Sequence, residues 1–162
     1  MRFCAAVVLS ALVGIPVAAQ TRPDLSGTWT IDTARSDPAP AVSPGRGAAG
    51  RGRGGAPSNQ IVVRQTATEI SIARGAQNLT FQFDGTDTFW FQQGEIRATL
   101  AWDGDKAVIS WRKEVFTPAT GAYVNTTGKD VYSLAGSELR QDSTTVSPTG
   151  TTTSKTVYTK SP

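Results

Sequence analysis

The feature that most constrains the fold is a period-two alternation of apolar or β-branched residues with polar ones through most of the chain. Leu79, Phe81 and Phe83, for example, fall on one face of an extended segment, with polar residues between them. Alternation of this kind places one face of a β-strand on a core and the other in water. Short segments containing Gly, Asp or Pro interrupt the pattern, and no stretch has convincing helical periodicity. The sequence therefore predicts an all-β fold.

Turn residues divide this pattern into short consecutive strands. Asp84-Gly85 and Asp103-Gly104 are tight-turn pairs, because glycine accepts the positive φ that a hairpin loop requires. So many sequential strands without a helical crossover favour a sandwich or an up-and-down barrel. We expect an antiparallel up-and-down β-barrel of 8–10 strands, because closure removes the exposed edges of a long meander. The expected strands are residues 26–32, 59–66, 69–74, 78–83, 88–92, 95–102, 106–115, 122–134, 138–147 and 151–160.

The N-terminus has the features of a cleaved signal peptide. Arg2 supplies a positive charge, residues 3–15 form an almost unbroken apolar run, and small residues at 17–19 precede Gln20. A membrane-spanning helix needs roughly 20 apolar residues, whereas Pro16 ends this run earlier. We expect residues 1–19 to be removed, leaving one exported domain, 20–162, in the periplasm or secreted, with no membrane anchor.

Composition narrows the possible chemistry. The chain has one cysteine, Cys4, which lies in the predicted signal peptide, and it has no histidine. A mature chain without either residue has no thiolate nucleophile, no histidine base and no His/Cys zinc site. The sequence therefore offers little support for an enzyme, and it predicts no catalytic residue, no metal site and no cofactor.

One connection stands apart in composition, from Ser36 to Ser58. It is rich in Gly, Pro and Arg, with Arg46, Arg51 and Arg53 in one short tract. Such a segment buries too little apolar surface to offset its ordering, which predicts a mobile loop that trypsin cleaves first. The formal charge is only +3, and one tract without interleaved aromatics does not predict a nucleic-acid partner.

Three short motifs in residues 24–160 carry a family resemblance. Gly27-Thr28-Trp29 resembles the first-strand signature of the lipocalins and the wider calycin group, in which the glycine permits close backbone approach and the indole plugs one end of a barrel. Trp102-Asp103-Gly104 and residues 156–160 look like later strands of fatty-acid-binding proteins. The chain is also similar to small exported lipocalin-like proteins of bacteria.

The resemblance implies a calyx-like barrel with an internal ligand site. This chain has its Gly/Arg/Pro loop where fatty-acid-binding proteins have a helical portal between the first two strands. At the position of their carboxylate-binding arginine it has Thr156, and only Tyr158 matches that site.

Aromatic and cationic residues of the β-domain are the candidate ligand groups. We interpret Trp29 and Trp102 as packing residues, because large rings usually fill cores. Phe89-Trp90-Phe91 places rings on both faces of one strand, as expected if one face lines a cavity. The predicted ligand-binding residues are Trp90, Trp111, Arg112, Tyr132 and Tyr158.

Two groups of charged residues have simpler alternatives. Arg112 is either a cavity cation that receives an anionic group or a surface cation paired across the sheet or with Glu114. Asp84 with Asp87, and Asp103 with Asp105, suggest acid/base or calcium pairs, but each pair straddles a glycine turn. Aspartate in a turn usually accepts hydrogen bonds from nearby backbone, and we expect that role here.

The sequence thus favours an exported barrel that binds a small hydrophobic or amphipathic molecule in its interior. Two alternatives of other classes remain open at this point. One is a cell-envelope interaction or structural protein that acts through its loop and outer surface, without an internal ligand. The other is an enzyme that uses polar groups inside the barrel. The sequence does not decide the oligomeric state.

Overall fold

The computed structural model describes residues 22–38, 59–91, 94–117 and 121–162. Within them the chain forms ten β-strands and no helix. The expected strands are all present, with ends that differ from the prediction by at most two residues. They are β1 (Gly27–Ile31), β2 (Gln60–Gln65), β3 (Glu69–Arg74), β4 (Gln77–Gln82), β5 (Thr88–Phe91), β6 (Glu95–Asp103), β7 (Lys106–Thr117), β8 (Ala122–Ala135), β9 (Glu138–Ser147) and β10 (Gly150–Lys160).

All ten strands belong to one antiparallel sheet in the order β4-β3-β2-β1-β10-β9-β8-β7-β6-β5. Neighbours in the sheet are neighbours in the chain, except that the first strand, β1, pairs with the last, β10. That pairing wraps the meander into a nearly closed barrel. The predicted all-β, up-and-down barrel is confirmed.

The barrel is interrupted between β4 and β5, the two ends of the sheet. A hydrogen bond from Thr88 Oγ1 to the Thr80 carbonyl oxygen, at 2.7 Å, crosses this gap. Asp84-Gly85 does form a turn here, with Gly85 at φ 83°. It does not join two paired strands as the sequence suggested, whereas Asp103-Gly104 connects β6 to its ladder partner β7.

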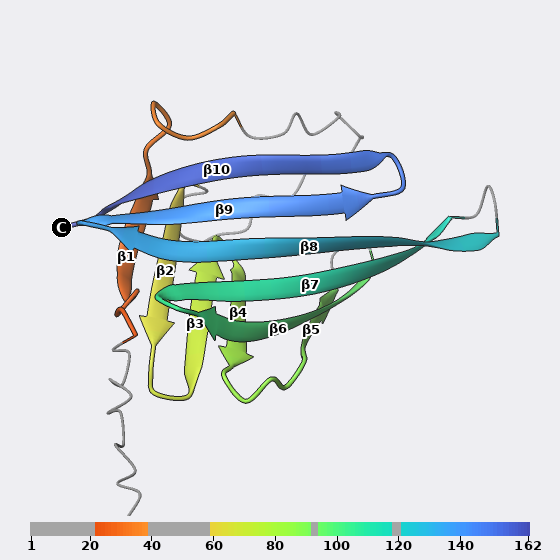
Figure 1. Cartoon of the computed structure of the whole chain (residues 1–162), viewed down its shortest axis with the longest axis horizontal. Helices are drawn as coiled ribbons and strands as arrows, with labels where there is room; N and C mark the ends of the chain where they lie inside the picture. Colours follow the sequence, from red (N-terminus) through yellow and green to blue (C-terminus); the bar gives the residue numbers. More distant parts are fainter. Residues whose placement is uncertain (1–21, 39–58, 92–93, 118–120) are drawn as a thin grey trace, which may run out of the picture.

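Figure 1 shows the long strands β7–β10 crossing β1–β4 at a steep angle, so that the two halves of the sheet face each other. The β7–β8 hairpin is the longest and extends beyond the other strands (Figure 1). Between the two halves lies an interior that is filled at one end of the barrel and hollow at the other.

The filled end is built around Trp29, which is 2% exposed. Its indole N–H donates to the carbonyl oxygen of Leu25 at 3.0 Å, so the buried ring leaves no polar atom unpaired. A Cβ on Gly27 would lie 2.9 Å from Lys160 Cε, and this glycine has φ 151°. The predicted packing role of Trp29 is therefore confirmed, and the atoms close to Gly27 belong to the Lys160 and Trp29 side chains. Other fully buried residues of this core include Ile61, Ile70, Leu100 and Leu139.

Trp102 packs at the same end of the barrel, as predicted. Its ring lies 5.7 Å from that of Phe83, measured between centroids. The Arg22 guanidinium lies over both rings, 5.4 Å from the Phe83 centroid and 5.7 Å from the Trp102 centroid. These contacts close the filled end with the segment that precedes β1.

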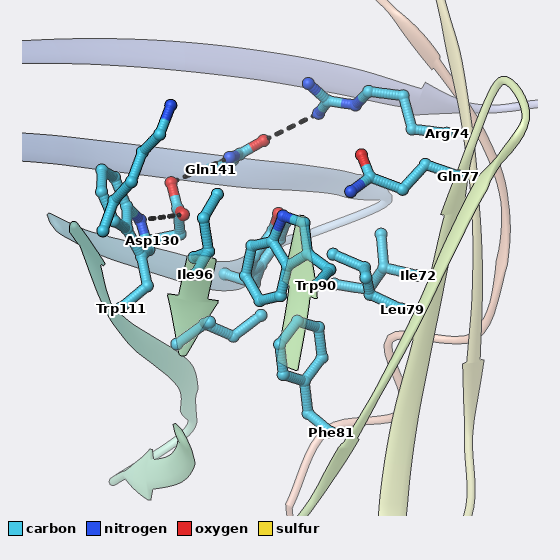
Figure 2. A pocket seen from close by; sticks show the side chains of 13 residues that line it. Ile72, Arg74, Gln77, Leu79, Phe81, Trp90, Ile96, Trp111, Asp130 and Gln141 are labelled. Carbon is cyan, nitrogen blue, oxygen red and sulfur yellow. Dashed lines mark hydrogen bonds between the residues drawn. The ribbon is translucent and has the colours of Figure 1, made fainter. Parts of the chain in front are cut away.

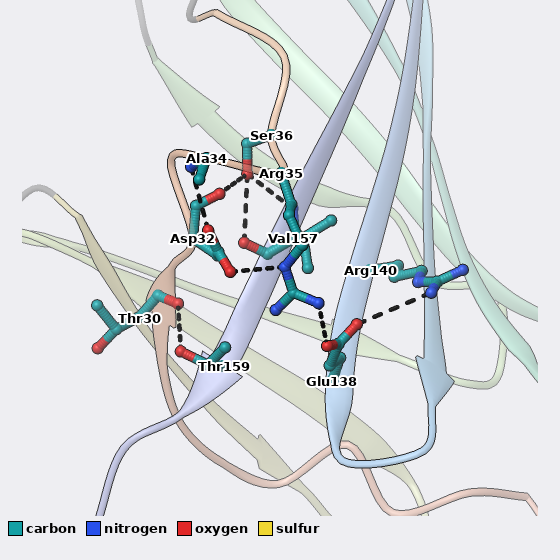
Figure 3. A network of polar contacts seen from close by, with 9 residues as sticks. All are labelled: Thr30, Asp32, Ala34, Arg35, Ser36, Glu138, Arg140, Val157 and Thr159. Carbon is teal, nitrogen blue, oxygen red and sulfur yellow. Dashed lines mark hydrogen bonds and ion pairs between the residues drawn. The ribbon is translucent and has the colours of Figure 1, made fainter.

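The chain that follows β1 is fastened to the outer edge of β10 (Figure 3). Asp32 N–H donates to the carbonyl oxygen of Val157, and Val157 N–H donates to Ser36 Oγ, at 2.8 and 2.9 Å. Arg35 forms ion pairs with Asp32 and with Glu138 at the start of β9. Ser36, placed at the start of the expected mobile loop, is therefore bound to the sheet.

The other predictions for this loop and for the N-terminus cannot be compared with the structure. Residues 1–19, the predicted signal peptide, lie outside the described residues. So do Arg46, Arg51 and Arg53, the predicted trypsin sites.

Candidate functional site

The hollow half of the barrel contains a cavity of about 510 Å³. Its volume falls within the range of roughly 300–1,000 Å³ that is typical of small-molecule sites. Both sides of the β4–β5 gap contribute, and Phe81 meets Trp90 edge-on there with ring centroids 6.2 Å apart. The lining residues are Ile72, Arg74, Gln77, Leu79, Phe81, Trp90, Ile96, Ile109, Trp111, Lys113, Asp130, Tyr132 and Gln141.

Strand alternation explains why these side chains point inward. Ile70, which is buried in the filled core, is followed at the same parity on β3 by Ile72 and Arg74. On β7 the same parity gives Trp111 and Lys113, which line the cavity. On β3 and β7 the inward face thus passes from apolar residues to a basic residue, whereas β4, β8 and β9 contribute Gln77, Asp130 and Gln141 to the cavity.

A chain of hydrogen bonds runs across the cavity wall (Figure 2). Trp111 Nε1 donates to Asp130 Oδ2 at 3.0 Å. Asp130 Oδ1 accepts from Gln141 Nε2 at 3.1 Å and also from Ser143 Oγ. Each of these partners is neutral, so oriented dipoles bind the Asp130 carboxylate, which belongs to none of the ion pairs among the residues that the structure describes.

The same chain continues from Gln141 to Tyr158 and Arg74. Gln141 Oε1 accepts from Tyr158 Oη at 2.8 Å and from Arg74 Nη2 at 3.2 Å. Arg74 Nη2 also donates to Tyr158 Oη at 2.5 Å. Five strands, β3, β7, β8, β9 and β10, are tied together by this network.

Gly128 on β8 makes room for the Trp111 indole. The two residues are direct partners in the β7–β8 ladder. A Cβ on Gly128 would lie 2.1 Å from Trp111 Cζ2, which no packed side chain tolerates. The ring therefore covers the glycine backbone, and this position holds the indole N–H against Asp130.

The cavity lining contains two basic side chains, Arg74 and Lys113, and one acidic side chain, Asp130. In the part of the chain that the structure describes, the ion pairs involve other residues, and neither Arg74 nor Lys113 is paired with a carboxylate. Arg74 is exposed and Lys113 is half-buried, so both sit near the mouth. The mouth therefore carries positive charge above an apolar interior.

Two buried tyrosines border the cavity. Burial raises the pKa of Tyr132, with the nearby Asp130 carboxylate adding to the effect. Burial also raises the pKa of Tyr158, and the Arg74 guanidinium opposes the increase. Both phenols are consequently neutral hydrogen-bonding groups at physiological pH.

The residues predicted to bind a ligand occupy different places. Trp90, Trp111 and Tyr132 line the cavity. Tyr158 is fully buried beside it and belongs to the hydrogen-bond network. Arg112 instead lies on the outer face, 3.8 Å from Asp87, because its neighbours on β7 point inward.

Sequence reasoning missed Arg74, Lys113, Asp130 and Gln141. A signal for Arg74 was present, since the parity of Ile70 and Ile72 continues to it. A similar signal existed for Gln141, because it lies two residues after the fully buried Leu139 and therefore on the same face of β9. The candidate ligand groups were sought among aromatic and cationic residues, so the neutral Gln141 and the acidic Asp130 were not considered.

One of the turn aspartates, Asp84, accepts a hydrogen bond from nearby backbone, as the sequence predicted. Asp84 Oδ1 accepts from Thr86 N–H at 2.8 Å, and this hydrogen bonding lowers the pKa of the Asp84 carboxyl. No cluster of potential metal ligands occurs among the described residues. The same residues contain no helix long and apolar enough to cross a membrane.

Comparisons of the chain with models of protein families, with curated proteins and with solved structures found no match.

Proposed function

We propose that this protein is a binding protein whose barrel interior holds a small amphipathic molecule with an acidic group. Export to the periplasm or the exterior, and a place in the calycin group, belong to the same proposal. The observation that carries it is the distribution of chemistry along the cavity, with unpaired basic side chains at the mouth and apolar side chains below.

The apolar part of the ligand would contact Ile72, Leu79 and Phe81 on one wall, and Trp90 and Ile96 on the other. These side chains line the cavity. Burying apolar ligand surface against them is favourable by about 25 cal/mol per Å². A fatty-acyl or compact aromatic body suits such a wall.

The acidic group would lie between Arg74 and Lys113. Arg74 already donates to the neutral acceptors Gln141 and Tyr158, so its charge is oriented without being neutralised. A carboxylate or sulfonate would accept charge-assisted hydrogen bonds there. Because Arg74 is exposed, solvent screening limits this contribution, and the apolar wall supplies the larger share of affinity.

The test compares decanoic acid with decan-1-ol by calorimetric titration of the purified protein. We expect one site and at least about tenfold tighter binding of the acid, which corresponds to about 1.4 kcal/mol. Arg74→Met and Lys113→Met should each lower the affinity for the acid toward that for the alcohol. Arg64→Met, which removes an exposed cation from β2, is the matched control and should change neither affinity. Equal affinities for acid and alcohol, or no binding of either, would contradict the proposal.

A further inference from the structure

The outer face of β5–β8 carries an unusual concentration of exposed aromatic side chains. Phe89 and Phe91 on β5 are 54% and 80% exposed, and Phe116 and Tyr123 on β7 and β8 are 50% and 69% exposed. Exposed aromatics clustered on one face commonly mark an interaction surface. Here they lie along β5 and toward the end of the β7–β8 hairpin, beside charged residues on β6 and β7, so the face combines apolar and charged groups.

The charged residues are paired with like charges in the sheet register. Glu95 lies directly opposite Glu114, and the next outward-facing pair along the strands is Arg97 opposite Arg112. Like charges directly opposite each other destabilise a strand pair. Arg97 forms an ion pair with Glu95, and Arg112 lies 3.8 Å from Asp87, which relieves the repulsion only in part. The face therefore presents an acidic cross-strand pair, Glu95 with Glu114, beside a basic pair, Arg97 with Arg112. These two pairs are called the acidic rung and the basic rung below.

This arrangement is complementary to itself. A two-fold axis that runs parallel to the rungs, midway between them, places the acidic rung of one copy on the basic rung of another. Glu95 then meets Arg97 of the second copy, and Glu114 meets its Arg112. Closed two-fold dimers use the same patch on both subunits in this way.

The same rotation also matches the residues around the charges. Positions equally far from the axis along a strand are exchanged, so Phe91 of one copy meets Phe89 of the other. Tyr123 meets Lys129, which is exposed on β8 and suited to a cation–π contact.

The rotation also places Phe116 of one copy over Ser110 of the other, so that a projecting ring meets a hollow in the outer face. Phe116 projects from β7 against Tyr123, with ring centroids 5.3 Å apart. Beside Ser110 the outer face has a hollow of about 320 Å³. Its lining includes Thr99, Ser110 and Thr127, whose short hydroxyl side chains leave space for a ring beside Arg112.

From this match of charge and shape we propose that the protein forms a two-fold symmetric dimer through the outer face of β5–β8. The partner is a second copy of this chain, with its strands antiparallel to those of the first across the interface. The proposed contact residues are absent from the cavity lining, so this inference is independent of what the barrel binds.

Charge reversal with complementation tests the proposal directly. One variant carries Arg97→Glu and Arg112→Glu, and the other carries Glu95→Arg and Glu114→Arg. Sedimentation velocity should show the unaltered protein as a dimer and each variant alone as a monomer. An equimolar mixture of the two should form a heterodimer, identified by its mass in native mass spectrometry.

Phe116→Ser is a second variant that leaves every charge in place. We expect it to weaken dimerisation at least tenfold, while circular dichroism shows an unchanged fold. Arg64→Met, on the far strand β2, should leave dimerisation unchanged. A monomeric unaltered protein at all concentrations, or charge-reversed variants that still dimerise alone, or a mixture that stays monomeric, would overturn the proposal.

Discussion

Arg74 donates a hydrogen bond to the phenolic oxygen of Tyr158 at 2.5 Å, from β3 to β10, although β1 and β2 lie between these strands in the sheet. This contact exists only because the sheet curves into a barrel. It holds a positive charge at the cavity mouth against a neutral phenol that donates onward to Gln141. The guanidinium is thereby positioned for an anion before any ligand arrives, which reduces the ordering cost of binding.

Replacement of Gly128 by alanine should destabilise the fold. Its Cβ would lie 2.1 Å from the Trp111 ring, so the indole must move away from Asp130. We expect the free energy of unfolding to fall by about 1–3 kcal/mol, as for other overpacked sites. Urea denaturation measures the change.

A double-mutant cycle supplies the control for this prediction. In a Trp111→Ala background the ring is gone, so Gly128→Ala should change the free energy of unfolding by less than about 0.5 kcal/mol. An equal loss in both backgrounds would mean that the glycine matters for backbone reasons and not for the indole.

Stability should decline at alkaline pH because of the buried tyrosines. Burial raises the pKa of Tyr132 in the folded state, whereas the unfolded phenol titrates near its usual value of about 10. Above that pH the unfolded state releases a proton that the folded state keeps, so unfolding becomes more favourable as the pH rises. Below that pH this contribution to stability is fully present.

Tyr132→Phe removes one such group and should make the decline shallower. The expected difference in slope is up to about 1.4 kcal/mol per pH unit, measured by urea denaturation between pH about 8 and about 11. The two proteins compared near pH 8 provide the internal control, because the Tyr132 phenol is protonated there in the folded state and in the unfolded state. Parallel curves of unfolding free energy against pH for the two proteins would contradict this, because Tyr132 would then lose its proton over the same pH range in the folded and unfolded states.

The strand pattern was predictable because side-chain alternation and turn residues are local properties. Their combination gave all ten strands and the barrel class, and it placed Trp29 in the core. The gap between β4 and β5 was not predictable in this way, since Asp84-Gly85 has the composition of an ordinary hairpin turn. Whether the strands on either side of a turn pair with each other depends on how the whole sheet closes, which the turn residues do not determine.

The candidate site was predictable only for its aromatic part. Trp90, Trp111 and Tyr132 are conspicuous because large rings are costly to leave exposed. Arg74 was missed because its partners, Gln141 and Tyr158, come from strands far from it in the sequence, and only barrel curvature brings them together. Gln141 was missed although its other partners, Asp130 and Tyr158, lie on the neighbouring strands β8 and β10, because a polar residue did not suggest an interior position. Arg112 and Lys113 are adjacent cations, and the parity of Trp111 decides which of them faces inward.

The central claim, that a ligand occupies the barrel interior, has four built-in reporters. Trp90 and Trp111 line the cavity, whereas Trp29 and Trp102 pack at the filled end. Each indole N–H gives its own signal in a proton–nitrogen correlation spectrum, and variants that lack one tryptophan assign the signals.

Titration of this spectrum with decanoic acid is the most direct measurement. The account predicts that the Trp90 and Trp111 signals shift together and saturate at one equivalent, while those of Trp29 and Trp102 stay in place. Signals of Trp90 and Trp111 that do not move at saturating ligand, or shifts confined to Trp29 and Trp102, would contradict it.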